Sequence, residues 1–272
     1  MTSLLHRSYL FVPGNRPERF DKACASAAHA VIIDLEDAVP PGDKRAARDS
    51  IARWLRPEQS VLLRINSAES EWFRDDLRLC ALAGVAGVVL PKAERADEIG
   101  EVHAASQEKP VYPLIESAWG FENARKLARA PYVRRLMFGS IDFQVDLGIE
   151  GDDEELMHFR SELVLASRLA NIASPVDGVT TAFDNLEVLR KETVRARRFG
   201  FGGKLCIHPK QVEHVNRFFA PTEEEVAWAR RVLAAAGSAE SAAVALDGKM
   251  VDRPVILKAQ QVMAEHEARD GR

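Results

Sequence analysis

Eight short apolar segments of strand length recur along the 272-residue chain, and each leads into a helix-like stretch. Repeated strand–helix units of this kind place their strands in parallel, side by side. Eight such units in a chain of this length predict a (β/α)8 barrel. A doubly wound open sheet is the alternative, although no GxGxxG motif follows the first segment, which disfavours the dinucleotide-binding form. The predicted strands are residues 8–12, 30–35, 61–65, 87–90, 111–115, 136–138, 176–180 and 204–207.

The barrel is predicted to occupy residues 1–220, and residues 221–272 are predicted to form a C-terminal extension. Helical patterns at 222–236 and 253–269 flank a stretch at 237–252 that is rich in Gly, Ser and Ala. Small residues offer little surface for packing, so this stretch is expected to be either a surface linker or a mobile lid.

Composition limits the classes of partner. A hydrophobic content of 46% with 29% charged residues is typical of a soluble globular protein. The formal net charge of −4 gives no support for general binding to nucleic acid or membranes, so an anionic ligand needs a local basic cluster. The N-terminal residues lack the apolar run of a signal peptide. The three cysteines are far apart and read as reduced thiols, which makes the cytoplasm the expected compartment.

Two acidic residues follow the fifth and sixth predicted strands. Glu116 comes directly after residues 111–115, and Asp142 follows residues 136–138 after a short turn. Neighbouring parallel strands lie about 4.8 Å apart and end on the same side, so both carboxylates can reach one small cation. Oxygen ligands without a cysteine cluster favour Mg²⁺ first and Mn²⁺ second. The competing interpretation is that these acids cap the helices that follow them.

Further charged residues follow other strands, at the rim where barrel active sites form. Glu36 and Asp37 are candidates to hydrogen-bond metal-bound water. Arg64 lies in an apolar strand and is predicted to clamp an anionic oxygen of the substrate, to pair with Glu36 or Asp37, or to do both. His208 precedes a proline and fits a packed histidine at least as well as a catalytic one.

A basic series begins at the first predicted helix. Arg16, Arg19 and Lys22 recur every third residue, beside a helix N-terminus that favours anions. The series fits either a site for the phosphates of a nucleotide-bearing ligand or an ordinary solvated helix face.

Eight stretches, among them SYLFVPGNRPERFDKA, VIIDLEDAVPPGDKRAAR, PLIESAWG and GFGGKLCIHPKQV, resemble the citrate lyase β-subunit-like proteins of the HpcH/HpaI aldolase family. The resemblance implies a barrel of the phosphoenolpyruvate/pyruvate type that assembles as a homotrimer or hexamer. It also implies Mg²⁺-dependent cleavage or formation of a carbon–carbon bond in a 3-hydroxyacyl-CoA thioester.

The resemblance also assigns roles to individual residues. Glu116 and Asp142 match the metal ligands, and Glu116 thereby also contacts the substrate. Arg64 matches the substrate-binding arginine, and Glu36 and Asp37 match the acidic pair near the metal waters. The basic segment with Arg16 and Lys22 matches the region that holds CoA. Asp247 matches a general acid/base on a mobile C-terminal segment that, in relatives, reaches the site of a neighbouring subunit.

The sequence therefore predicts a lyase that cleaves citramalyl-CoA, citryl-CoA or malyl-CoA into acetyl-CoA and a 2-oxo acid. A malyl-CoA thioesterase, a class II aldolase acting on free 2-oxo acids, and an inactive scaffold subunit are the alternatives. Acyl-carrier and transferase subunits accompany citrate lyase itself, and one chain does not reveal whether they exist here.

Overall fold

The computed structural model describes residues 6–237, 244–246 and 248–270. The chain divides into two compact units, Met1–Asn216 and Arg217–Arg272. Within the described ranges, no helix combines the length and the apolar character needed to cross a membrane.

The first unit contains a closed barrel of parallel strands in the order β1 to β8, so the predicted (β/α)8 barrel is confirmed and the open-sheet alternative is wrong. Pairing of Ser8 with Lys204 joins the first strand to the eighth and closes the sheet. The strands are β1 (Ser8–Pro13), β2 (Ala30–Asp34), β3 (Val61–Arg64), β4 (Val85–Leu90), β5 (Val111–Ile115), β6 (Arg135–Phe138), β7 (Ala173–Asp177) and β8 (Gly203–Cys206).

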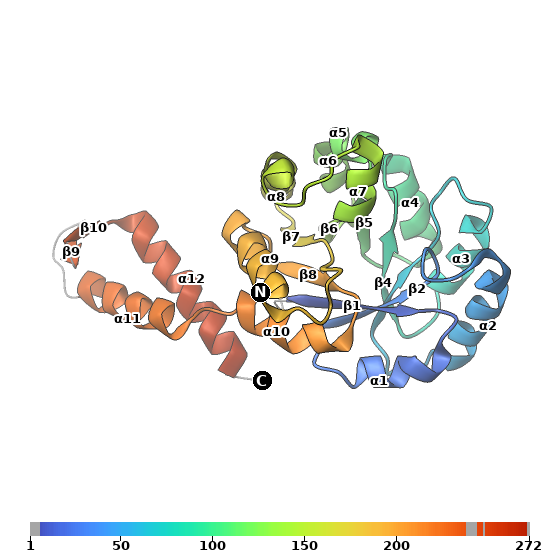
Figure 1. Ribbon diagram of the computed structural model, residues 1–272, viewed down its shortest axis with the longest axis horizontal. Coiled ribbons are helices and arrows are strands. Elements are labelled where there is room, and N and C mark those ends of the chain that lie inside the picture. The colour runs from blue at the N-terminus through green and yellow to red at the C-terminus, as the bar shows by residue number, and fades with distance from the viewer. Residues whose placement is uncertain (1–5, 238–243, 247, 271–272) are drawn as a thin grey trace. The chain divides into compact units, whose positions relative to one another are not determined.

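The helical segments that follow the strands lie around the outside of the barrel (Figure 1). Amphipathic patterning explains this placement, because each main helix buries one apolar face against the strands. They are η1 (Pro17–Arg19), α1 (Phe20–Cys24), η2 (Pro41–Asp43), α2 (Lys44–Trp54), α3 (Phe73–Cys80), α4 (Ala96–Ala105), α5 (Ala118–Glu122), α6 (Ala124–Ala128), α7 (Ser140–Leu147), η3 (Glu154–Leu156), α8 (Met157–Leu169), α9 (Leu186–Phe199) and α10 (Pro209–Phe219).

The barrel interior is a packed core. Each strand directs alternate side chains inward, and the inward residues from successive strands fill the lumen in layers. Buried members of this core include Tyr9, Ile32, Leu62, Val89, Leu114, Met137, Val176 and Leu205.

Two elements differ most from the sequence-based expectation, and the boundaries of the other strands differ from it by at most two residues. The seventh strand is Ala173–Asp177 rather than residues 176–180. Its first half contains a serine and a proline, which weaken the strand signal, although the Pro175 carbonyl still accepts the Gly202 N–H at 2.9 Å. Between the fifth and sixth strands the sequence predicts a helical stretch at residues 121–129, and the structure has two short helices there, α5 and α6, which meet at Asn123.

The second unit contains α11 (Glu223–Gly237), the strands β9 (Val244–Leu246) and β10 (Lys249–Val251), and α12 (Arg253–Asp270). The two strands pair antiparallel, so the stretch predicted as a linker or lid contains a hairpin. Ala229 and Val232 of α11 pack with Val251 and Ala259 in a small apolar core.

Candidate active site

On three of the barrel strands, the row of inward-facing side chains ends in a charged residue at the C-terminal rim. Asp34 lies two positions after Ile32, Arg64 two positions after Leu62, and Glu116 two positions after Leu114. Side chains two apart on a strand share a face, so these three point inward at the C-terminal rim, above the apolar core.

Asp34 and Arg64 form a bidentate pair. The register of β2 and β3 places the two residues opposite each other. Arg64 Nε donates to Asp34 Oδ1 at 2.7 Å, and Nη2 donates to Oδ2 at 2.6 Å. The same carboxylate accepts the backbone N–H of Glu36 at 2.9 Å and of Ala38 at 3.1 Å, which fixes the loop after β2. The sequence-based interpretation missed Asp34, although a carboxylate ending the buried run AVIID is itself a signal.

The acids predicted as partners of Arg64 lie farther around the same guanidinium. Arg64 Nη1 is 2.9 Å from Glu36 Oε2 and 3.3 Å from Asp37 Oδ2. The Glu36 side chain is buried, whereas that of Asp37 is 56% exposed. Burial alone would lower the pKa of Arg64, but the charge and hydrogen bonds of Asp34 outweigh it and raise that pKa. Arg64 is therefore a fixed cation at the rim.

Lys92, directly after β4 and Pro91, links two of the acids. Its ammonium donates to Glu36 Oε1 at 2.7 Å and lies 4.0 Å from Glu116 Oε1. Its backbone N–H donates to the same Glu116 oxygen at 2.7 Å. Burial alone would lower the pKa of Lys92, but the hydrogen bond to Glu36 and the nearby carboxylate charges raise it.

Glu116 occupies a tight position between two neighbouring strands. One carboxylate oxygen faces Lys92, and the other lies so close to Gly139 that a Cβ on that residue would sit 2.5 Å away. The residue is 3% exposed. Burial, then the charges of Glu36 and Asp142, raise the pKa of Glu116 to about 8, against the opposing charges of Arg64 and Lys92. Asp142 lies in the first turn of α7, directly beyond Gly139, and is half-buried.

Negative charge is in excess at this rim. Among the described residues the ion pairs join four carboxylates to two cations, and Asp142 adds a further carboxylate whose charge acts on Glu116. Such an excess suits a hard divalent cation. No group of three or more His, Cys, Asp or Glu side chains arranged to hold a metal occurs in the described part of the chain, so water or substrate would have to complete the coordination of a metal here. The four paired carboxylates are those of Asp34, Glu36, Asp37 and Glu116.

A buried lysine supports the loop that carries Glu36. Lys44 Nζ donates to the carbonyl oxygens of Leu35 and Glu36 and to Asn66 Oδ1, each at 2.7 Å. Asn66 in turn donates to Asp76 Oδ2 at 2.6 Å. Sequence reasoning missed this network because its members lie on separate helices and loops and show no motif.

The residues predicted for CoA lie outside this charged network. Arg16 directly precedes η1, and Lys22 lies on the five-residue helix α1. Both side chains are exposed, and neither makes an ion pair or a side-chain hydrogen bond within the part of the chain that the structure describes. The predicted acid/base Asp247 lies outside the described residues.

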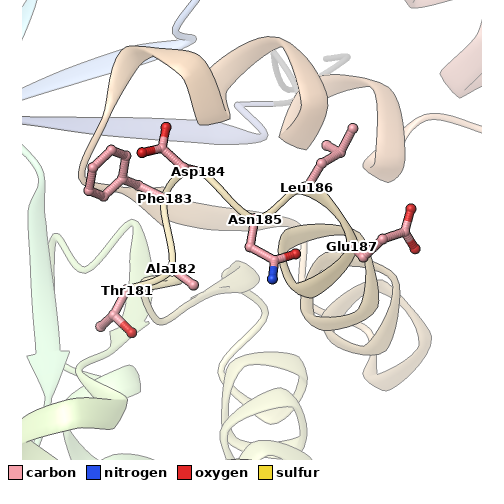
Figure 2. A pocket seen from close by; sticks show the side chains of 7 residues that line it. All are labelled: Thr181, Ala182, Phe183, Asp184, Asn185, Leu186 and Glu187. Carbon is pink, nitrogen blue, oxygen red and sulfur yellow. The ribbon is translucent and has the colours of Figure 1, made fainter.

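A separate surface pocket lies in the loop between β7 and α9, and Figure 2 shows the residues that line it. Its Phe183 ring stacks on His208, with ring centroids 5.0 Å apart. This contact supports the interpretation of His208 as a packed side chain. The pocket residues are Thr181, Ala182, Phe183, Asp184, Asn185, Leu186 and Glu187.

Comparisons with known proteins agree with the resemblance read from the sequence. Residues 7–209 match the family described as HpcH/HpaI aldolase/citrate lyase, and residues 158–268 match one described as a C–C bond lyase of the TIM-barrel fold. A citrate lyase subunit beta-like protein of Deinococcus radiodurans is 38% identical, over 97% of this chain and 98% of the relative. A (3S)-malyl-CoA thioesterase of Cereibacter sphaeroides is 34% identical, over 96% of this chain and 95% of its own.

A solved structure of a related protein is also similar to this chain. The CitE protein of Mycobacterium tuberculosis, crystallised with magnesium, acetoacetate and coenzyme A, superposes with a TM-score of 0.86. It is 36% identical, and the match covers 96% of this chain and 98% of that one. These matches confirm the family prediction: the chain belongs to the HpcH/HpaI aldolase/citrate lyase family.

Proposed function

We propose that this protein is a Mg²⁺-dependent carbon–carbon lyase that cleaves a 3-hydroxyacyl-CoA thioester into acetyl-CoA and a 2-oxo acid. The excess of negative charge around the buried Glu116 is the observation that carries the proposal, because a buried carboxylate needs a compensating cation. The relative crystallised with magnesium, acetoacetate and coenzyme A supports both the metal and the class of substrate.

The residues present fit the metal. Glu116 and Asp142 would be its protein ligands, and two carboxylates are a common protein share of a Mg²⁺ site. Glu36 Oε2 is buried, and although it lies 2.9 Å from Arg64 it accepts no hydrogen bond from the described residues. It can therefore accept one from a metal-bound water, with the exposed Asp37 as a second acceptor. When bound, the metal supplies Lewis acidity toward the carboxylate and the adjacent oxygen of the 2-oxo acid half.

The cleavage needs a proton removed at one position and supplied at another. A base takes the proton of the 3-hydroxyl group, the bond between C2 and C3 breaks, and its electron pair forms the enolate of acetyl-CoA. Arg64, held rigid by Asp34, would stabilise negative oxygen as it develops. Asp247 is proposed to protonate the enolate carbon, or to abstract the methyl proton in the synthetic direction. Arg16 and Lys22 are proposed to meet the phosphates of CoA.

An assay with a small panel of thioesters tests the proposal. The purified protein with Mg²⁺ is given citramalyl-CoA, citryl-CoA and malyl-CoA, and the 2-oxo acid and acetyl-CoA are quantified. We expect equal amounts of both products from at least one thioester and none after chelation of the metal. Cleavage of free 2-oxo acid aldols at a higher rate than any thioester would favour the class II aldolase instead.

Hydrolysis of malyl-CoA is the second candidate, because relatives described as (3S)-malyl-CoA thioesterases are 34% identical over almost the whole chain. A thioesterase releases free CoA thiol, whereas the lyase leaves the thioester intact in acetyl-CoA. Following thiol release and 2-oxo acid formation in the same reaction therefore separates the two activities.

The assembly remains a prediction. A homotrimer or hexamer is expected, and light scattering during size-exclusion chromatography would measure its mass. Purification from the native source would show whether acyl-carrier and transferase subunits accompany it.

A further inference from the structure

Lys92 has a backbone conformation that is unusual for its residue type. Its φ of +46° lies in the left-handed region that favours glycine. This conformation directs its backbone N–H at Glu116 Oε1, 2.7 Å away. Backbone strain of this kind is concentrated at functional sites, so the surroundings of the Lys92 side chain are informative.

The Lys92 ammonium lies between two of the rim carboxylates. It donates to Glu36 Oε1 at 2.7 Å and lies 4.0 Å from Glu116, and the charge of Asp37 acts on it as well. The other cation among the ion pairs of this rim, Arg64, is held by its bidentate pair with Asp34. Lys92 therefore supplies the only cation among the described residues in contact with Glu116.

The Lys92 side chain is only partly enclosed by the protein. It is 46% exposed, whereas those of Glu36 and Glu116 are buried. A flexible four-carbon stem at the surface can withdraw its ammonium into water without repacking the core.

We propose that the Lys92 ammonium is a resident counter-cation that competes with the divalent ion for the acidic rim. The proposal rests on the metal site of the proposed function and adds a residue that sets the affinity of that site. In the metal-free protein the ammonium compensates Glu36 and Glu116 and stabilises the fold. A divalent ion supplies the same compensation, so its binding displaces the ammonium and is weakened by that cost.

Replacing Lys92 by glutamine tests the competition. Lys92→Gln removes the charge but keeps the same backbone requirement, since both residues carry a Cβ. Isothermal titration calorimetry with Mg²⁺ alone should show a Kd lower by about tenfold or more, since a like charge about 4 Å from a binding site opposes a cation strongly. The metal-free variant should also melt at a lower temperature than the wild type, and saturating Mg²⁺ should close that gap. A Kd that is unchanged or higher in the folded variant overturns the proposal.

Two further variants isolate the cause. Lys92→Gly keeps the backbone N–H, relaxes the left-handed φ and also removes the ammonium, so its Kd should fall as in Lys92→Gln. A fall in the glycine variant alone would assign the effect to backbone strain and overturn the competition. Lys126→Gln changes the net charge equally on the exposed surface of α6 and should leave the Kd unchanged.

The failure of this inference can be separated from failure of the proposed function. If the wild type binds Mg²⁺, Glu116→Gln does not, and Lys92→Gln binds as the wild type does, the competition is wrong and the metal site stands. If the wild type does not bind Mg²⁺, or if Glu116→Gln binds it equally well, both are wrong.

Discussion

Two charged networks are built on the barrel strands, on opposite faces of the sheet. The rim network contains Asp34, Arg64 and Glu116. These are the last inward-facing side chains at the C-terminal ends of β2, β3 and β5. The outer network begins at Asp177 and Lys204, which lie next to the inward Val176 and Leu205 and therefore point outward. There Arg160 of α8 reaches Asp177 at 3.1 Å, between the strands and the helices.

The outer network has equal numbers of acids and bases, and the residues at its centre are buried. Its ion pairs join four acids to four bases, counted over the described residues. Asp177 is 0% exposed, and Lys204 and Arg160 are each 1% exposed. Burial alone would raise the pKa of Asp177, but Lys204 and Arg160 outweigh it and lower that pKa. The members are Asp152, Asp153, Asp177 and Glu192, with Arg160, Lys191, Arg195 and Lys204.

The balance of acids and bases distinguishes the two networks, whereas the presence of an unsatisfied buried oxygen does not. Each contains a buried carboxylate oxygen that accepts no hydrogen bond within the described ranges, Glu36 Oε2 and Asp177 Oδ2. An unsatisfied oxygen therefore does not identify a functional site in this molecule. The rim network alone has more acids than bases, and a raised carboxylate pKa accompanies that excess. We therefore assign the balanced network to the stability of the fold and propose the unbalanced one as the ligand site.

Breaking the outer network should give the largest effect on stability. Asp177→Ala leaves the buried Lys204 and Arg160 short of a partner, which should lower the free energy of unfolding by about 3–5 kcal/mol. Denaturant unfolding measures the loss, and the Mg²⁺ Kd of the folded variant should stay that of the wild type. In contrast, Asp184→Asn removes an exposed pair with Lys210 and should cost less than about 1 kcal/mol. Equal losses of stability in the two variants would contradict the assignment of Asp177 to a buried network.

Glu116→Gln should act in the opposite way, on the ligand rather than on the fold. Loss of a supporting residue alone typically costs metal sites about 10–100-fold in affinity, so loss of Glu116, the proposed direct ligand, should exceed about 100-fold. Calorimetry with Mg²⁺ measures the affinity, and lyase activity should fall with it. Glu122→Gln on the exposed face of α5 makes the same chemical change and should bind Mg²⁺ normally. Metal-dependent activity equal to that of the wild type in Glu116→Gln would remove Glu116 from the site.

The pH dependence of stability should also distinguish the rim. The pKa of Glu116 in the folded protein is about 8, above its ordinary value of 4.5, so between these values the folded state binds more protons than the unfolded state. The contribution of Glu116 is therefore full below about pH 4.5 and is lost as pH rises toward 8, by at most about 1.4 kcal/mol per pH unit. Unfolding of the metal-free protein across this range measures it. The loss should be smaller in Glu116→Gln, and a loss of equal size there would show that other groups cause it.

Asp37→Asn should have the smallest effect. The Asp37 side chain is more than half exposed and lies 3.3 Å from an Arg64 that Asp34 already holds. Solvent screens such a pair, so the free energy of unfolding should change by less than about 1 kcal/mol. A modest rise in the Mg²⁺ Kd is expected if Asp37 accepts from a metal-bound water. A loss of stability as large as that of Asp177→Ala would show that exposure is a poor guide to this rim.

The sequence predicted the fold and the rim for a common physical reason. Apolar runs mark strands, and barrel strands end at one rim, so the residues after each run could be grouped without knowing any contact. The seventh strand was misplaced because Ser174 and Pro175 interrupt the apolar signal. Contacts were harder to predict than positions: Asp34 was overlooked although it is the closest partner of Arg64.

The features that the sequence did not predict depend on three-dimensional geometry, which no local sequence pattern encodes. The left-handed φ of Lys92 aims its N–H at Glu116, and nothing in the residues around it encodes that direction. The outer pair of Asp177 and Lys204 arises from strand register across a crossover helix. The general acid/base role of Asp247 and the CoA contacts of Arg16 and Lys22 remain predictions.

The position of Glu116 has a consequence for folding. Its carboxylate is oriented by Lys92 after β4 and by Gly139 after β6, so three consecutive strands must be assembled before the side chain is held in place. A chain that has formed β5 alone has the carboxylate but not its orientation. Stabilisation by Mg²⁺ should therefore appear late in refolding, only in molecules whose β4–β6 segment has closed, and the ion would report the completion of this part of the barrel.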